Sequence, residues 1–503
     1  MKLNSQLCPL LFSLFLITVQ SCRLPIEDVD TAINAEIAAP LVDTKTTIKD
    51  MLTGLDSTAS LRIDSDGQIT AQFITTSKAN TALDPFEGIP NNFVPLIDSV
   101  SAIPFAPPGG LKIANADLKK GMTHYIVSNN FNEALTMTFR IPQMTKNGVI
   151  YQKTFNLPVG ATPVKDSVDL TGYTLNVPND QVIIYYEARK NSTKERVLLN
   201  NVQFAFRYLQ GKFVKGYFGV NRFDIPKDSI NIGFIQKLMR GEVRFADPKI
   251  TLTLENSFGI PVRTRVNTAE VVTVDKKRMA LTGTFVSNGA NLNYPATNEV
   301  GQMKSTQIIL DKSNSNVVDI ISSKPTSMVY DIDGIINPDG NRNISGFLLD
   351  TSTFKMKINI EVPLYATVKG FEESDTLAIT FPSTKDIDHA DFKIIADNGT
   401  GLNANLQAYF LDVNNRVIDS LYSSANETIL KAAAVDANGK VITPLRNISN
   451  VKMDLTKMTR LQASKKVIIK YTFSTVNNGS TPVRLLSSQE IKVKIGVVAG
   501  VKK

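Results

Sequence analysis

Short segments of β-branched and aromatic residues, separated by polar turn residues, recur along this chain of 503 residues. Phe, Tyr, Val, Ile and Thr gather in runs bounded by Asn, Gly, Asp and Pro, whereas long stretches of helical period are almost absent. Residues 249–254 and 466–473 are typical, because their side chains suit a pleated sheet with one buried face. The sequence therefore predicts an all-β protein built from sandwich-like domains.

Two segments have the apolar spacing of a short helix. Residues 46–55 place Ile48, Met51 and Leu55 on one stripe, and residues 232–240 group apolar side chains ahead of Gly241. We expect one or two short helices that plug the ends of β domains.

Internal similarity indicates about three related units. The chain is too long for one β-sandwich, and the segment from Asp169 to Thr174 recurs as residues 454–459. Both copies are followed, at the same spacing, by a Val-Ile-Ile strand, at residues 182–186 and 467–471, and a looser copy lies at 311–330. We place the three β domains at residues 33–204, 205–349 and 350–503. Repetition is expected where one hairpin cannot bury its own apolar face.

A second pattern precedes each copy. An extended segment, a turn that contains Asn, and another extended segment occur at residues 124–139, 250–266 and 392–410. This pattern supports the same division into three.

The N-terminus has the features of an export signal. Lys2 precedes an apolar run at residues 9–19 that is too short to span a bilayer, and the small residue Ser21 precedes Cys22. This arrangement resembles the signal of bacterial lipoproteins, although Gln20 is bulkier than the usual occupant. The resemblance implies that residues 1–21 are removed and that Cys22 carries fatty acyl chains, including palmitate. Residues 22–32 would form a tether.

The whole chain resembles the large uncharacterised β-rich lipoproteins of Bacteroidetes-type envelopes, which supply no activity to carry over. The resemblance implies a cell-envelope protein, an outer-membrane lipoprotein, on either the periplasmic or the external side. Its membrane partner would be reached through the N-terminal lipid.

Scarcity of reactive side chains argues against an enzyme. Cys8 lies in the signal and Cys22 at the cleavage point, so the mature domains lack thiols for disulfides, zinc or nucleophilic catalysis. His124 and His389 are the only histidines, and neither lies in a catalytic or zinc-binding motif. We therefore expect no cofactor and no catalytic residue. We expect both histidines to lie in strands or turns.

Three segments begin like a calcium loop, with Asp-x-Asp/Asn-Gly at residues 64–67, 331–334 and 436–439. None continues to the closing glutamate of an EF-hand. Asp-Gly and Asn-Gly also suit tight hairpins, and we favour that interpretation for all three. The best set of calcium ligands combines nearby oxygen donors: Asp331, Asp333, Asn337 and Asp339.

Basic residues are concentrated between Arg189 and Lys249. Convergence on one face would create a site for an anionic glycan or lipid, with these candidate residues: Lys212, Lys215, Arg222, Lys237, Arg240 and Arg244. The alternative, which we favour, is that these cations keep exposed strands soluble. Residues 215–220 resemble the aromatic strand of RNA-recognition domains but depart from its order, and we expect no nucleic-acid partner.

Four classes of function remain open. A non-enzymatic structural or binding module of the envelope, whose partner is another envelope protein or an anionic polymer, is preferred. An amphiphile carrier lined by runs such as residues 358–365 is the alternative. A hydrolase that uses an aspartate pair, or a pilus-type subunit with a donated strand, is less favoured.

Overall fold

The computed structural model describes residues 36–48, 60–77, 80–81, 85–86, 89, 91–105, 107, 110–160, 162–223, 227–232, 241–379, 387–423 and 427–501. The expected signal, Cys22 and the tether lie outside these residues. Only the first residues of segment 46–55, and only Ile232 of segment 232–240, are described, so neither expected helix is tested.

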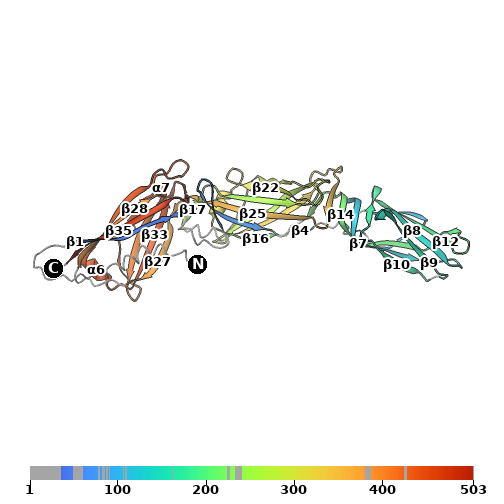
Figure 1. The fold of residues 1–503 in the computed structure, drawn as a ribbon, viewed down its shortest axis with the longest axis horizontal. Coiled ribbons are helices and arrows are strands. Elements are labelled where there is room, and N and C mark those ends of the chain that lie inside the picture. The colour runs from blue at the N-terminus through green and yellow to red at the C-terminus, as the bar shows by residue number, and fades with distance from the viewer. Residues whose placement is uncertain are drawn as a thin grey trace, which may run out of the picture.

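The prediction of an all-β protein is confirmed. Strands form three sandwich-like groups in a row, and Figure 1 shows them as an elongated molecule. We call these groups the base domain, which contains both the first and the last described strands, the middle domain, and the outer domain at the opposite end.

The described strands are assigned to the domains as follows. The outer domain contains β5 (Val94–Pro95), β6 (Val100–Pro104), β7 (Lys112–Val127), β8 (Leu135–Lys146), β9 (Val149–Leu157), β10 (Val164–Asp169), β11 (Thr174–Asn176), β12 (Gln181–Lys190), β13 (Arg196–Val197) and β14 (Val202–Tyr217). The middle domain contains β2 (Ser60–Ile63), β3 (Ile69–Thr76), β4 (Asn80–Thr81), β15 (Asn221–Phe223), β16 (Asp228–Asn231), β18 (Lys249–Asn256), β19 (Val262–Thr273), β20 (Arg278–Ala280), β21 (Asn291–Leu292), β22 (Lys304–Leu310), β23 (Pro325–Ile336) and β25 (Thr353–Pro363). The base domain contains β1 (Glu36–Thr47), β26 (Tyr365–Lys369), β27 (Phe371–Ala378), β28 (Ile387–Asn398), β29 (Leu402–Leu411), β30 (Val417–Ser420), β31 (Glu427–Leu430), β32 (Leu445–Asp454), β33 (Lys466–Thr475), β34 (Val483–Arg484) and β35 (Glu490–Val501).

Two short strands join neighbouring domains. Strand β24 (Gly346–Leu349) pairs with β14 at the outer junction, and β17 (Glu242–Phe245) pairs with β26 at the base junction. The described residues also include short helices: α4 (Thr284–Asn288), α5 (Val317–Ser322), α6 (Leu455–Leu461), α7 (Val476–Gly479) and the 3-10 turn η3 (Pro178–Asp180).

The same strand pairing is used in every domain. The first long strand pairs with two later strands, in the combinations β7 with β10 and β14, β18 with β22 and β25, and β28 with β32 and β35. The second long strand pairs with the strand after the repeated Asp segment, as β8 with β12, β19 with β23, and β29 with β33. The three units are therefore related in topology as well as in sequence.

A buried asparagine occupies the turn between the first two long strands of each unit. Asn129, Asn256 and Asn398 each accept a backbone N–H from the residue two positions later, at 2.8–3.0 Å. Each side-chain amide donates to a carbonyl of a more distant segment: Pro158, Asn293 and Lys431 respectively. Each asparagine thus ties the turn to its domain.

Strands from the first part of the described chain pair in all three domains. Strand β1 pairs with β35 in the base domain, β3 with β25 in the middle domain, and β5 with β14 in the outer domain. The chain therefore runs out along the molecule and returns, which differs from the expected first domain at residues 33–204. A sheet edge accepts any strand of matching pattern, so local sequence does not reveal which domain receives it.

Neither expected boundary lies between the two domains that it was expected to separate. Residue 205 lies inside β14, and residue 350 lies just after β24. The domains are consequently joined by continuous strands and connecting segments of sheet.

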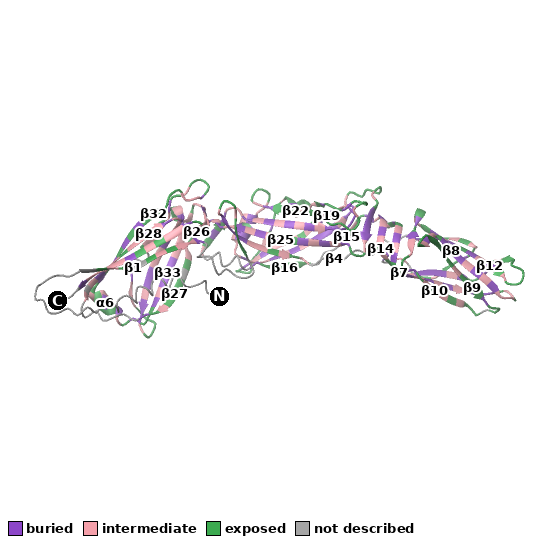
Figure 2. Ribbon diagram, viewed as in Figure 1, coloured by how far each residue is buried: buried purple, intermediate pink, exposed green. Residues whose placement is uncertain are grey.

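Buried and exposed positions alternate along most strands, as Figure 2 shows for all three domains. One hydrophobic cluster includes Tyr125 of the outer domain, Ile358 of the middle domain and Ala366 at the base junction. A continuous core of this kind opposes hinge motion between the outer and middle domains, because bending would expose apolar surface. The main core of the base domain is separate and includes Phe410 and Ile469.

Candidate functional site

The expected calcium ligands do not share one loop. Asp331 and Asp333 lie inside β23, and the turn follows at residues 337–340, where Asn337 and Gly340 have φ angles of 46° and 65°. The hairpin expected at 331–334 is therefore wrong, because the buried alternation of β23 continues to Ile336. The other two expected hairpin turns are confirmed, at residues 64–68 between β2 and β3 and at residues 436–440.

Protein groups already engage several of these candidate ligands. Asp333 is 1% exposed, forms an ion pair with Arg222 and accepts a hydrogen bond from Asn267. The amide of Asn337 donates to the carbonyl of Asn341, and Asp339 extends into solvent near Arg263. Across the described ranges, no group of three or more His, Cys, Asp or Glu residues has the arrangement of a metal site.

The structure separates the candidate anion-binding residues. Lys212 and Lys215 lie on β14 at the outer junction, whereas Arg244 lies on β17 near the base domain, at the other end of the middle domain (Figure 1). Arg222 pairs with Asp333 and Arg244 with Asp319. Lys237 and Arg240 lie outside the described residues. The six residues therefore do not form one described patch.

The two histidines lie in strands, as expected. His124 is in β7 and His389 in β28. Burial, with a smaller contribution from Arg207, lowers the pKa of His124. This shift favours the neutral imidazole, whose Nε2 atom has no hydrogen-bond partner in the described structure.

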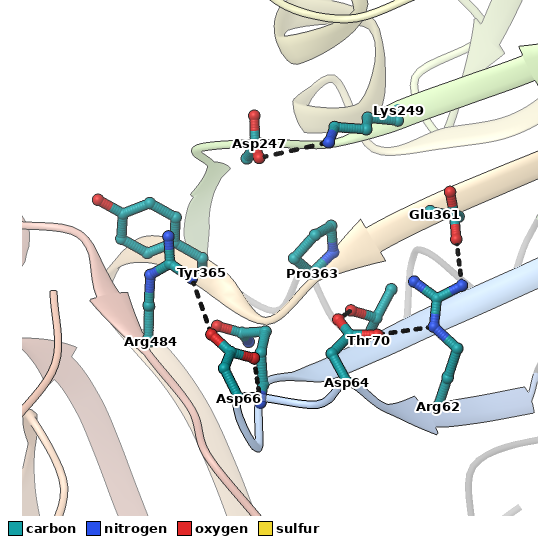
Figure 3. Close-up of a pocket in the computed structure, with 11 residues that line it drawn as sticks. Arg62, Asp64, Asp66, Thr70, Asp247, Lys249, Glu361, Pro363, Tyr365 and Arg484 are labelled. Carbon is teal, nitrogen blue, oxygen red and sulfur yellow. Dashed lines mark hydrogen bonds and ion pairs between the residues drawn. The ribbon is translucent and has the colours of Figure 1, made fainter. Parts of the chain in front are cut away.

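A polar pocket of about 180 Å³ lies at the junction between the middle and base domains (Figure 3). It is lined by the following residues: Arg62, Asp64, Asp66, Gln68, Thr70, Asp247, Lys249, Glu361, Pro363, Tyr365 and Arg484. The segments that supply them are the β2–β3 hairpin, the start of β18, the end of β25, and β26 with β34.

Ion pairs engage the pocket carboxylates. Arg62 contacts Asp64 at 2.7 Å and Glu361 at 2.5 Å, and Asp247 lies 3.9 Å from Lys249. Asp66 lies 3.7 Å from both Lys440 and Arg484 of the base domain. This arrangement is a mixed charge network across a domain junction.

Asp66 is held in its charged form. The Gln68 backbone N–H donates to its carboxylate, and this bond, together with Lys440 and Arg484, lowers the pKa of Asp66. A general acid needs the opposite shift. The guanidinium of Arg484 also lies 4.6 Å from the centre of the Tyr365 ring and donates to the Asn438 carbonyl.

Backbone hydrogen bonds reinforce the same junction. Ile69 N–H donates to Leu485, Leu485 N–H to Leu364, and Ser487 N–H to Gly67. Gln68 is 3% exposed, and its amide donates to the carbonyls of Ile69 and Leu485. The pocket is therefore part of a closed joint between two domains.

Sequence reasoning identified only part of this pocket. Asp64 and Asp66 appeared as residues of a hairpin turn, and Glu361 lay in the run at residues 358–365 that was expected to line a groove, while Asp247 and Arg484 carried no local signal. Their side chains come together because strands from distant segments meet at the junction.

The run expected to line an amphiphile groove is packed in the interior. Ile358, Ile360 and Val362 are each no more than 1% exposed and belong to the core cluster. The inward-facing side chains of β25 therefore form part of the hydrophobic core.

Comparisons with known proteins give no family. No family model matches the chain, and no curated protein matches it. Among solved structures, a protein from Parabacteroides distasonis that is inferred to be secreted is similar at 12% identity and a TM-score of 0.33. That alignment covers 56% of this chain and 88% of the other.

Two viral structures are more distant still. The VP2 subviral particle of infectious bursal disease virus matches at 6% identity and a TM-score of 0.16, over 98% of this chain and 86% of that one. The lipid-containing bacteriophage PM2 matches at 8% identity and a TM-score of 0.13, over 78% of this chain and all of the other. In the described part of the chain, none of the helices has the length and apolar character needed to cross a bilayer.

Proposed function

We propose that this protein is a non-enzymatic envelope lipoprotein that acts as a rigid spacer and holds its outer domain away from the membrane. Acylation of Cys22 would attach the chain beside the base domain, since β1 begins at Glu36, only a short segment later. The observation that carries the proposal is the path of the chain, which runs out to the outer domain and returns to the base (Figure 1).

Rigidity supports a spacer. The outer and middle domains share one hydrophobic cluster, and the middle and base domains share backbone hydrogen bonds and the ion pairs of Asp66. A flexible linker would not hold the outer domain at a fixed distance from the membrane, whereas domain junctions with buried contacts would.

The first test is acylation. Cells that express the full chain are labelled with a palmitate analogue, and we expect the label to be lost in Cys22→Ala and retained in Asn414→Ala. Persistence of the label in Cys22→Ala would contradict the anchor.

The second test is the position of each domain. An epitope is inserted either in the outer-domain turn at Asn147–Gly148 or in the base-domain turn at Asn414–Asn415. On cells whose outer leaflet is accessible, or on spheroplasts if the anchor faces the periplasm, we expect antibody fragments to bind the outer epitope better. Equal or reversed accessibility would exclude an orientation with the outer domain projecting from the membrane.

A further inference from the structure

Strand β14 contains an exposed tyrosine in an unusual backbone conformation. Tyr208 has a φ angle of 56°, and it is the only aromatic residue among the described non-glycine residues with positive φ. The pairing of β14 with β7 is irregular here, because Arg207 faces Met122 while Gln210 faces Lys120. The bulge directs the Tyr208 side chain outward, where it is 67% exposed. Positive φ is costly for a bulky residue and is found mainly where the surrounding structure imposes it.

One residue of the preceding segment holds this conformation. The side-chain oxygen of Asn91 accepts the Tyr208 N–H at 3.2 Å, and the backbone carbonyl of Asn91 accepts the Arg207 Nε–H at 3.1 Å. The Arg207 guanidinium lies over the ring of Phe93, 4.8 Å from its centre. These contacts fix the guanidinium of Arg207, the residue that directly precedes Tyr208. They also leave both Nη groups of Arg207 without an acceptor in the described structure.

Two lysines lie close to Tyr208 in the strand pairing, one on β14 and one on β7. Tyr208, Gln210 and Lys212 are exposed, while the intervening Leu209 is buried, so these three side chains point away from the core. Lys120 is exposed opposite Gln210. Among the described residues, no carboxylate lies within 4.0 Å of Arg207, Lys120 or Lys212, although neighbouring Lys119 is paired with Asp350.

We propose that this cluster, formed by Tyr208, Arg207, Lys120, Gln210 and Lys212, binds an acidic polysaccharide. The flat ring of tyrosine offers an apolar face to a sugar and a hydroxyl for hydrogen bonding. The guanidinium and the two ammonium groups bind carboxylate or sulfate substituents on neighbouring sugars. The four steps of chain from Tyr208 to Lys212 span at most roughly 13 Å, because the bulge shortens the strand, and this length suits a linear chain of several sugars.

The position favours a polysaccharide over lipid headgroups. The cluster lies on β14, close to the junction between the outer and middle domains, and the middle domain separates it from β1 (Figure 1). This argument rests on the proposed anchoring at the base, whereas the binding chemistry does not. A failure of the anchor would leave the binding measurement below unchanged.

The test measures binding of the full-length chain, purified in detergent, to four acidic polysaccharides: polygalacturonate, alginate, hyaluronate and heparin. Neutral dextran and vesicles of phosphatidylglycerol with phosphatidylcholine are the comparators. We expect saturable binding to at least one acidic polysaccharide, and a loss of affinity of about tenfold in Tyr208→Ala. Tyr208→Phe should retain most of the affinity.

Matched variants separate this site from general charge. Lys120→Gln with Lys212→Gln should weaken binding, while Lys355→Gln with Lys357→Gln, which remove the same charge from β25, should not. Tyr185→Ala, at another exposed tyrosine of the outer domain, should bind as the unmodified chain does. Tyr208→Asn provides a variant that tolerates positive φ, so that loss of the ring is measured in a folded domain.

Three results would overturn the proposal. These are absence of binding to all four acidic polysaccharides, equal loss of affinity in the two lysine pairs, and unchanged affinity in both Tyr208→Ala and Tyr208→Asn. Binding to the anionic vesicles that exceeds polysaccharide binding and depends on Tyr208 would assign the site to lipid instead.

Discussion

Gly259 lies against the ring of Phe347, so closely that a Cβ atom at residue 259 would stand 2.1 Å from the ring atom Cε1. The two residues also form an isolated β-bridge, and Phe347 stacks on Phe213 of β14 with ring centres 6.0 Å apart. This contact joins a turn of the middle domain to the strand that enters the outer domain.

Gly259→Ala should therefore loosen the outer junction. A methyl group would displace the fully buried Phe347 ring, and we expect a loss of stability of about 1 to 3 kcal/mol. Thermal unfolding and limited proteolysis near residues 346–349 provide the measurement. Gly496→Ala is the control, because the nearest atom to a Cβ there is 3.7 Å away. Equal stability of the two variants would contradict the tight contact.

The turn asparagines should be individually important. Asn398 accepts two hydrogen bonds from Thr400 and donates to the carbonyls of Leu402 and Lys431. Asn398→Ala leaves these buried groups unpaired, so we expect the base domain to lose about 2 kcal/mol or more. Chemical denaturation measures this loss, and Asn414→Ala in an exposed turn should have little effect. A neutral outcome in Asn398→Ala would show that water replaces the amide.

The outer domain contains a buried pair of tyrosine hydroxyls. Tyr151 contacts the hydroxyls of Tyr125 and Thr123, and burial raises the pKa of Tyr151 to about 12. Tyr151→Phe removes the shared partner, and we expect a loss of about 1 to 3 kcal/mol in the outer domain. Tyr185→Phe, at an exposed ring, is the comparison in thermal unfolding. If Tyr151→Phe were at least as stable as Tyr185→Phe, the hydroxyl contacts would contribute nothing net.

Acid should weaken the joint at Asp66. The folded-state pKa of Asp66 is lowered from its usual value, which is about 3.9 in an unfolded chain. Its stabilising contribution is therefore present above that pH and is lost as the pH falls through the lowered folded-state pKa. Because this carboxylate is partly exposed, we expect Asp66→Asn to cost no more than about 1 kcal/mol at pH 7.

The experiment measures thermal unfolding of the unmodified chain and of Asp66→Asn from pH 7 to pH 2.5. The difference in Tm should shrink as the solution becomes acidic, because Asp66 itself becomes protonated. Asp339→Asn, at a largely exposed carboxylate, is the matched control. If the difference in Tm stayed constant with pH, the effect of Asp66→Asn would come from the shape of the side chain and not from its charge.

Much of the fold could be predicted from local pattern. The alternation in residues 249–254 and 466–473 predicted strands β18 and β33, and the repeated Asp segment indicated related units. Asp169 accepts the backbone N–H of Thr171, and Asp454 accepts that of Lys457 at the start of α6. Short-range hydrogen bonding of this kind leaves a readable signature in the sequence.

Long-range pairing left no such signature. Nothing local in residues 36–47 shows that they pair with β35, and the position of Asp331 in a strand depended on the alternation that extends to Ile336. The cluster at Tyr208 was missed for the same reason. Its bulge depends on Asn91, which lies far from β14 in sequence.

The pairing of β1 with β35 has a mechanical consequence. The two strands lie antiparallel over almost the whole length of β1, with Glu36 opposite Gly500 and Thr47 opposite Glu490. In Figure 1, β1 runs lengthwise through the base domain toward the middle domain. A force that pulls Glu36 along the axis of β1 would load the β1–β35 pair in shear. The hydrogen bonds between the two strands would then resist together instead of breaking one after another.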